Sequence, residues 1–247
     1  MFHTCHSIAK KETSSLNRFL RRILLSRNVV TNIAISKEVS KTFIEYYGKK
    51  YKVPIINNGI ALAGNLKSVS HKDYDFVVVG RFVPLKNHKF LISSLHRYSL
   101  ESNRKIRSVF VGGGPTLNDC IDYAKTVGVD KYIKFEGEVD DVYPFLNNSK
   151  VFLLGSLYEG NPISILEAID CGLPVISTNV GGIKDVITNG VNGFLYEINN
   201  YDELKKCFDS IFNQRIYNAM IEANISLREK ISIEHTAKEY IKIFKGA

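Results

Sequence analysis

Short, continuous apolar runs alternate with helix-like segments through most of this chain, and no other feature constrains its fold as much. The runs lie at residues 75–80, 106–111, 132–135, 151–154 and 174–177, and helix-like segments lie at about 87–98 and 116–127 and from 162 onward. A strand that is apolar at every position is buried on both faces, and strands that alternate with helices form parallel sheets. The pattern therefore predicts an α/β fold with helices on both faces of a parallel sheet.

The first quarter of the chain has a shorter pattern of its own. It predicts a buried strand at residues 29–35, a helix over Lys37–Tyr47 and a short strand at residues 53–56. Ser36 suits the N-cap of that helix, and Gly48 suits its end.

The division into domains follows from a polar, pattern-poor stretch at residues 61–72, which is typical of a linker. We expect an N-terminal unit at residues 1–60, a larger domain at 61–231 and a closing helix within 232–247. The closing helix carries an apolar stripe that needs a surface to cover, so it packs on the N-terminal unit or exposes an apolar patch.

Basic residues are concentrated at the start of the chain, which carries a net charge of +8 in total. Residues 1–60 contain 11 Lys or Arg and 3 Asp or Glu, whereas the two signs balance in the rest. This asymmetry predicts an anionic partner, either an anionic membrane surface or a phosphorylated acceptor. Residues 16–25 have the pattern of a basic amphipathic helix, which lies at a membrane interface or packs inside its domain. Without interleaved aromatic and basic residues, nucleic acid is not expected as a partner.

Several classes are excluded by what the sequence lacks. No apolar run approaches the ~20 residues that span a bilayer, and the start has no apolar core of a signal peptide. Four scattered cysteines, Cys5, Cys120, Cys171 and Cys207, form no CxxC pair, so neither a zinc site nor a disulfide framework is predicted. We expect a cytoplasmic protein with reduced thiols, peripheral at the inner membrane face if the basic segment binds lipid.

Two cations follow the first apolar run of the larger domain. Gly80 and Arg81 come directly after the predicted strand, and Lys86 lies five residues later, where a helix begins. In an open parallel sheet, ligands bind beyond the carboxyl ends of the strands. Cations beside a helix N-terminus suit a pyrophosphate, although two solvated surface cations would give the same sequence.

Glycine-rich turns follow two other strands. Gly112, Gly113 and Gly114 precede Pro115, and Gly181 and Gly182 follow Val180. Such glycines allow a ligand to approach the backbone closely, but they also make ordinary tight turns. The dinucleotide fingerprint GxGxxG is absent, which disfavours an oxidoreductase.

The strongest local signal is the segment Ser-Leu-Tyr-Glu-Gly-Asn-Pro-Ile-Ser-Ile-Leu-Glu-Ala at residues 156–168. Glu159 lies in the loop, Gly160 and Asn161 turn the chain, and Pro162 suits the first position of a helix that carries Glu167. Two carboxylates that flank a helix N-terminus can bind sugar hydroxyls while the free amides hold phosphate. Taken singly, Glu159 is better explained as a solvated loop acid, and Glu167 as a helix-surface acid or part of a structural ion pair.

Taken in order, these motifs resemble family 4 of the retaining glycosyltransferases, which have the two-domain GT-B fold. The matching features are Gly80-Arg81 with Lys86, the Gly-Gly-Gly-Pro turn, Glu159 with Glu167, and the motifs at residues 172–175, 180–182 and 192–195. The resemblance covers about residues 30–245. It implies a Rossmann-like donor domain plus part of a second Rossmann-like domain that binds the acceptor.

The resemblance also implies residue roles. Arg81 and Lys86 would stabilise the leaving diphosphate, Glu159 would contact the donor sugar and Glu167 would hold the ribose hydroxyls. The other implied donor-binding residues are Gly80, Gly113, Gly114, Gly160, Asn161, Pro162, Ile163, Gly181 and Gly182. His6 would lie on the acceptor side. No metal or further cofactor is implied, and the donor would be a UDP- or GDP-sugar.

The implied reaction is sugar transfer, with retention, to a glycan or lipid-linked acceptor in cell-surface polysaccharide or glycolipid synthesis. One departure from the family is the late start, since most of the acceptor domain has no counterpart here. We therefore expect donor binding with poor transfer unless a second chain supplies the acceptor half. Two alternatives remain open, a non-catalytic donor-binding subunit and a sugar-nucleotide epimerase of the same fold.

Overall fold

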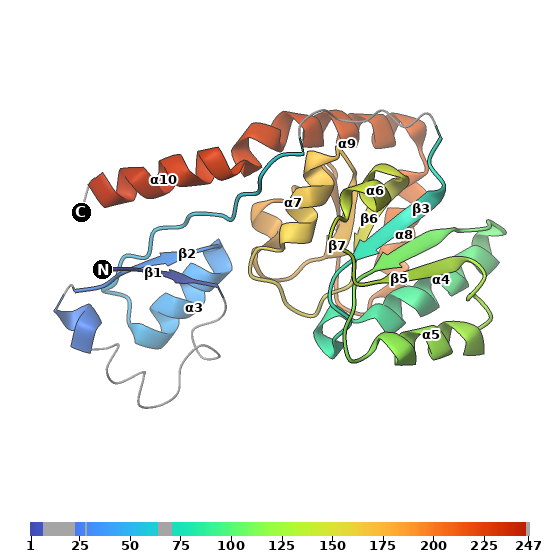
Figure 1. The fold of residues 1–247 in the computed structure, drawn as a ribbon, viewed down its shortest axis with the longest axis horizontal. Coiled ribbons are helices and arrows are strands. Elements are labelled where there is room, and N and C mark those ends of the chain that lie inside the picture. The colour runs from blue at the N-terminus through green and yellow to red at the C-terminus, as the bar shows by residue number, and fades with distance from the viewer. Residues whose placement is uncertain (7–22, 28, 64–70, 246–247) are drawn as a thin grey trace.

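A computed structural model describes residues 1–6, 23–27, 29–63 and 71–245 of the chain. Figure 1 shows two lobes, a small N-terminal lobe formed by described residues up to 60 and a larger C-terminal lobe formed by residues 71–231. The last helix starts on the C-terminal lobe and extends back over the N-terminal lobe, so that the two chain ends lie on the same side of the molecule (Figure 1). The described part of the chain contains no helix with the length and apolar character needed to cross a membrane.

The C-terminal lobe is built on a six-stranded sheet in which all neighbours are parallel. Its strands are β3 (Tyr74–Val79), β4 (Ser108–Val111), β5 (Ile133–Gly137), β6 (Ser149–Leu154), β7 (Val175–Thr178) and β8 (Gly193–Tyr196). The order β5-β4-β3-β6-β7-β8 means that the chain runs outward from β3 to one edge and then returns to the centre at β6. The reversal between β3 and β6 is a topological switch point, where open α/β sheets bind ligands beyond the carboxyl ends of their strands.

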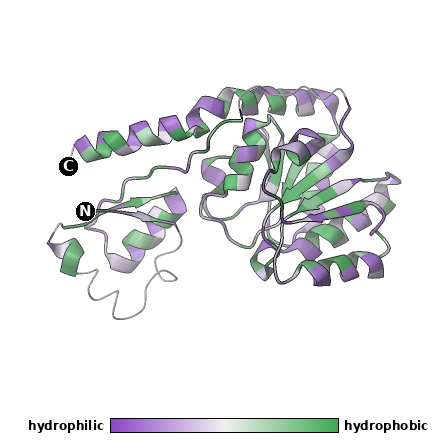
Figure 2. Cartoon of the chain, in the orientation of Figure 1, coloured by the Kyte–Doolittle hydropathy of each residue, from purple (hydrophilic) through white to green (hydrophobic). Residues whose placement is uncertain are grey.

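Helices connect the strands and cover both faces of the sheet. They are α4 (His88–Ser102), α5 (Leu117–Thr126), α6 (Tyr143–Asn147), α7 (Ile163–Asp170), α8 (Tyr201–Ile211) and α9 (Gln214–Leu227), with short 3-10 helices at Pro84–Lys86, Gly181–Asp185 and Arg228–Ile231. Figure 2 shows that hydrophobic residues are concentrated in the strands between these helices.

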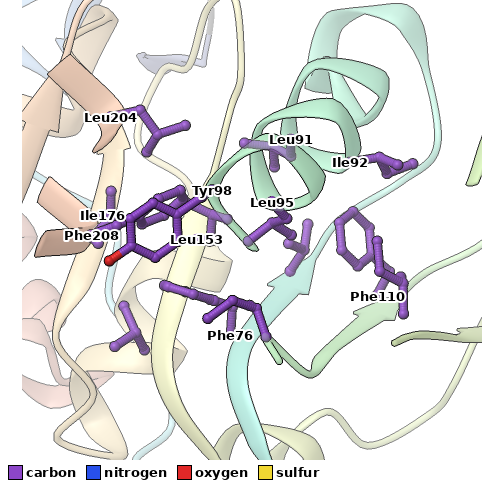
Figure 3. Packing of buried hydrophobic residues seen from close by; sticks show 14 of the residues in the cluster. Phe76, Leu91, Ile92, Leu95, Tyr98, Phe110, Leu153, Ile176, Leu204 and Phe208 are labelled. Carbon is purple, nitrogen blue, oxygen red and sulfur yellow. The ribbon is translucent and has the colours of Figure 1, made fainter. Parts of the chain in front are cut away.

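A hydrophobic core lies on each face of the sheet, and successive residues of each central strand pack alternately in one core and the other. Phe76 and Val78 pack in one core with residues of α4, α5 and α8, whereas Val77 and Val79 pack in the other with residues of α6 and α7. The first of these cores is shown in Figure 3, where Phe76 lies beneath Leu95 and Tyr98. Side chains of a strand alternate between faces, so burial of both faces explains why these strands are apolar at every position.

The N-terminal lobe pairs β1 (Phe2–Cys5) in parallel with β2 (Thr31–Ala34), and α3 (Lys37–Tyr47) packs beside them. Ser36 caps α3 by accepting a hydrogen bond from the amide of Val39, and Gly48 follows its last residue. The predicted helix and both predicted caps are therefore confirmed. Four residues of β1 pair with four of β2, so the strand predicted at 29–35 is shorter than expected.

One other expectation needs correction, one lies largely outside the described residues, and two elements were not expected. Residues 53–56 form no strand but a single bridge at Ile55, because Pro54 lacks the amide proton that a continued ladder requires. The short α6 and the strand β1 have no recognisable signal in the sequence. Of the amphipathic segment at 16–25, residues 16–22 lie outside the described residues, and helix is described at 23–26.

The closing helix α10 (Ile233–Lys245) contacts both lobes. At its start, the amide of Ile233 donates to the carbonyl of Ile60, and further along the hydroxyls of Thr4 and Tyr240 lie 3.1 Å apart. Near its end, the rings of Phe2 and Phe244 are 4.4 Å apart. The apolar stripe of α10 is thus partly covered by the N-terminal lobe, although Phe244 remains 46% exposed.

Candidate active site

The switch point of the sheet brings together the segments that follow β3 and β6. After β3 the chain passes through Gly80 and the 3-10 helix Pro84–Lys86 into α4, and after β6 it passes through a loop to α7. The amide of Leu157 donates to the carbonyl of Leu85 at 2.8 Å, which joins the two segments directly. Sequence order indicates only that these residues follow strands, whereas the topology makes them neighbours.

Lys86 and Glu159 form an ion pair at this junction. The Lys86 Nζ lies 2.6 Å from the Glu159 Oε1, and their side chains are 18% and 11% exposed. The Ser156 hydroxyl, which is fully buried, donates to the same oxygen at 2.6 Å. The other carboxylate oxygen, Oε2, makes no hydrogen bond to any residue that the structure describes, so one oxygen is anchored and the other is available to a ligand.

Arg81 lies beside this pair in a different environment. It is exposed and forms no ion pair within the described part of the chain, and it lines a pocket of about 480 Å³ together with Gly80 and the turn after β4. Gly80 lines this pocket and also lies next to Lys86 of the ion pair, since a Cβ built on Gly80 would be 3.7 Å from the Lys86 Cε. An anion in the pocket would therefore meet one free cation and one that is already paired.

The glycine turn after β4 lines the pocket. Gly112 has a φ of +139°, and a Cβ there would lie 2.1 Å from the carbonyl oxygen of Gly80. Gly114 is similarly constrained, at 2.4 Å from the carbonyl oxygen of Phe82. Side chains at these two positions would block the packing of the β3 and β4 exits, so the turn is required by the backbone as well as open to a ligand. Gly113 faces Glu138, which also lines the pocket.

Helix α7 begins one residue later than predicted. Pro162 is the residue before the helix, with extended dihedral angles, and Ile163 is the first helical residue and 43% exposed. No side chain caps the first turn, and although the amide of Ile165 donates to the carbonyl of Pro162, the amides of Ile163 and Ser164 make no hydrogen bond to a described residue and are open to an anion. Asn161 is buried just before this point, and its side chain donates to the carbonyl of Ile35 in the N-terminal lobe.

Glu167 lies on α7 and is half-buried, away from the Lys86–Glu159 pair. Its pKa is raised, first by burial and then by the negative charge of Asp141 in the loop before α6. The two glutamates therefore occupy unlike environments, since Glu159 has a cationic partner and Glu167 has a neighbouring anion. A carboxylate of this kind gains stability when a hydroxyl donates to it.

The glycines after β7 pack closely against the backbone of the loop that carries Glu159. A Cβ at Gly181 or Gly182 would lie 1.8 Å from the carbonyl oxygen of Glu159 or Gly160, respectively. The amide of Gly182 donates to the carbonyl of Glu159 at 3.0 Å. The main chain therefore already uses this amide, and the donor-binding role implied for Gly181 and Gly182 stays a prediction.

Residues of the N-terminal lobe close one side of the site. A Cβ on Gly160 would lie 2.6 Å from the carbonyl oxygen of His6, so the exposed His6 is next to the turn after Glu159. Asn58 donates to the carbonyl of Asn161 at 2.9 Å. Asp185 accepts a hydrogen bond from the first amide of α3, at Lys37, at 2.6 Å. These contacts fix how the two lobes meet at the mouth of the site.

Sequence reasoning missed two residues at the site. His88 is buried at the start of α4 and stacks on Phe82, with ring centroids 4.0 Å apart. Burial, aided by the charge of Lys86, lowers its pKa to about 4, so this imidazole is neutral at pH 7. Ser156 is only the first residue of a motif in the sequence, and its contact with Glu159 does not follow from spacing. An isolated histidine or serine gives no sequence signal of this kind.

Comparisons with known proteins agree with this geometry. A family model described as "Glycosyl transferases group 1" matches residues 66–228. The chain is 30% identical over 238 residues to a UDP-Gal:alpha-D-GlcNAc-diphosphoundecaprenol alpha-1,3-galactosyltransferase of Escherichia coli, covering 88% of this chain and 61% of that protein. It is 33% identical over 153 residues to the capsular polysaccharide biosynthesis glycosyltransferase CapH of Staphylococcus aureus, covering 61% and 42% of the two chains.

Among solved structures, HepE of Anabaena in complex with UDP is similar to the whole chain. The TM-score is 0.87 at 19% sequence identity, and the match covers 100% of this chain and 72% of that one. This likeness establishes the GT-B fold. The chain spans less than two thirds of the length of the two curated relatives described above.

Proposed function

The chain belongs to the group 1 glycosyl transferases, and on this premise we propose that it transfers a sugar from a nucleoside-diphosphate sugar to a glycan or lipid-linked acceptor. The Escherichia coli relative is named for transfer from UDP-Gal to a lipid-linked sugar, and the Staphylococcus aureus relative is named for capsular polysaccharide synthesis. One observation carries the proposal, the convergence of Arg81, Lys86 and Glu159 at the switch point of the sheet.

The cations suit the leaving group of such a reaction. When the glycosidic bond to the diphosphate breaks, negative charge develops on the phosphate oxygens, and a preformed cationic site stabilises that charge most in the transition state. The Arg81 guanidinium lines the pocket and forms no ion pair with the described residues, and Lys86 lies beside Gly80, which lines the same pocket. The open amides at the start of α7 add a further partial positive charge.

The two glutamates suit different parts of the donor. We assign Glu159 to the sugar, because its Oε2 is unoccupied by described residues and its carboxylate is fixed by two donors to Oε1. We assign Glu167 to the ribose hydroxyls, which would relieve its unfavourable proximity to Asp141. Transfer with retention of the anomeric configuration is part of this proposal and rests on the family resemblance.

A UDP-sugar is the first choice of donor and a GDP-sugar the second. Support for UDP comes from the donor named for the Escherichia coli relative and from HepE, which was solved with UDP and with UDP-glucose. The basic N-terminal lobe suits an acceptor presented at an anionic membrane surface. Its exposed cations include Lys41, Lys49, Lys50 and Lys52.

The test is a panel of UDP, GDP, UDP-galactose, UDP-glucose, UDP-N-acetylglucosamine and GDP-mannose. Binding is measured by calorimetry, and transfer to diphosphoundecaprenol-linked N-acetylglucosamine is followed by NMR, which reads the anomeric configuration of the product. Adding a polypeptide that carries an acceptor domain tests whether a second chain is needed. We expect binding of at least one nucleotide sugar and a product of retained configuration. Release of an epimerised free sugar, or binding of none of the panel, would contradict the proposal.

A further inference from the structure

The loop that carries Glu159 is fixed at three neighbouring positions. The Tyr196 hydroxyl donates to the carbonyl of Leu154, the Thr178 hydroxyl donates to the carbonyl of Ser156, and the amide of Leu157 donates to the carbonyl of Leu85. The three distances are 3.1, 2.6 and 2.8 Å. The backbone at Ser156 therefore has little freedom, and its hydroxyl is held in one place.

That hydroxyl contacts the glutamate and cannot contact a ligand. Ser156 is 0% exposed, and its Oγ donates to the Glu159 Oε1 at 2.6 Å. The same oxygen accepts from the Lys86 Nζ at 2.6 Å. Glu159 is thus held by one rigid, buried donor and by one donor on a flexible side chain.

The two hydrogen-bond donors to Glu159 are not equivalent once a nucleotide sugar binds. Under the proposed function, Lys86 also interacts with the diphosphate, so its ammonium is shared or withdrawn from Glu159. The serine hydroxyl has no second acceptor in the described structure and remains on Oε1. We propose that Ser156 is a positioning residue, which keeps the Oε2 of Glu159 directed at the donor sugar while Lys86 engages the diphosphate.

This inference rests on the proposed function and predicts that the affinity for a nucleotide sugar changes while the affinity for the nucleoside diphosphate does not. Loss of the Ser156 hydroxyl removes the rigid hydrogen-bond donor. The Glu159 carboxylate then moves with the Lys86 ammonium, and its contact with the donor sugar weakens. The nucleoside diphosphate alone lacks the transferred sugar that Glu159 is proposed to contact, so its binding is unaffected. A residue with a merely structural role would weaken both ligands alike.

The experiment compares dissociation constants of the full chain for a nucleotide sugar and for its own nucleoside diphosphate. The probes are UDP-galactose and UDP, or the tightest nucleotide sugar of the panel with its diphosphate. For Ser156→Ala we expect affinity for the nucleotide sugar to fall about tenfold, which corresponds to about 1.4 kcal/mol, with less than about a twofold change for the diphosphate. Ser177→Ala is the matched control, because Ser177 is also fully buried, lies on the neighbouring β7 and donates to the carbonyl of Thr178 and not to Glu159.

A double-mutant cycle gives the decisive readout. In a Glu159→Ala background, Ser156→Ala should change neither affinity, because Ser156 acts only through that carboxylate. Thr178→Val provides a second route if Ser156→Ala does not fold, and it should reduce the nucleotide-sugar affinity in the same direction. An equal loss for both ligands, a loss that persists without Glu159, or behaviour like Ser177→Ala would overturn the assignment. If the wild-type chain binds nothing in the panel, the proposed function fails first and this assignment with it.

Discussion

Replacing Lys86 by Met should destabilise the fold far more than a surface lysine change does. The substitution keeps the apolar stem and removes the ammonium, which leaves the Glu159 carboxylate buried without a cation. Breaking a buried ion pair by removing one partner costs about 3–5 kcal/mol. We expect a value near the lower end, about 3 kcal/mol, because the Ser156 hydroxyl still donates to the carboxylate.

The matched control is Lys205→Met, in a pair of the same chemistry on the surface. The Lys205 Nζ lies 2.9 Å from the Asp209 Oδ2, but the two side chains are 37% and 51% exposed. Exposed pairs one helical turn apart contribute about 0.3–0.5 kcal/mol. The distance is similar in both pairs, so burial alone accounts for the expected difference.

Urea unfolding followed by circular dichroism measures both variants, and equal slopes show that the unfolded states are comparable. A second substitution, Glu159→Gln, removes the stranded charge and should restore most of the stability lost in Lys86→Met. If Lys86→Met unfolds at the same urea concentration as Lys205→Met, the pair is not buried as described and the reasoning fails. Absence of any recovery with Glu159→Gln would refute it equally.

Four other perturbations test separate contacts and partners. Arg81→Ala should weaken nucleoside-diphosphate binding by about 1.5–3 kcal/mol in calorimetry, with an unchanged unfolding midpoint, since Arg81 is exposed. Glu167→Gln should raise the free energy of unfolding at pH 7. Because the pKa of Glu167 is raised in the folded state, the wild type loses stability as the pH rises from about 4.5 through that pKa. In a series of urea unfolding curves at different pH values, the variant should lack this decline in stability. Asp185→Ala should cost about 1–2 kcal/mol in thermal unfolding by removing the acceptor at the start of α3, whereas Lys37→Ala removes only an exposed ammonium and should cost less than about 0.5 kcal/mol. Vesicle sedimentation should show salt-sensitive binding to anionic but not neutral lipid, and equal binding to both would reject the membrane proposal.

Much of the fold could be predicted because burial leaves a direct trace in the sequence. The central strands are apolar at consecutive positions, as at Phe76, Val77 and Val78, because each face of the sheet has its own helical cover. The α3 boundaries were also predictable, since Ser36 and Gly48 have local conformational reasons to cap a helix. Short elements such as β1 and α6 depend on their tertiary partners and have no comparable signal in the sequence.

The sequence predicts residues of the candidate site one at a time, but it does not predict which of them are in contact. Spacing along the chain identifies Lys86 and Glu159 separately, whereas their contact depends on the reversal of strand order between β3 and β6. Gly182 shows the same dependence on the fold. Its position after a strand does not reveal that its amide donates to the carbonyl of Glu159.

The proposed function requires a nucleoside-diphosphate sugar to bind beyond the carboxyl ends of β3, β4 and β6. Hydrogen exchange measured by mass spectrometry, with and without a saturating nucleotide sugar from the panel, locates the ligand on the chain. We expect slower exchange at residues 80–86, 112–117 and 156–167, and weaker protection of these segments in Arg81→Ala when the ligand concentration is near the wild-type dissociation constant. Protection confined to the N-terminal lobe, or none at these three segments under saturation, would contradict the proposed binding site.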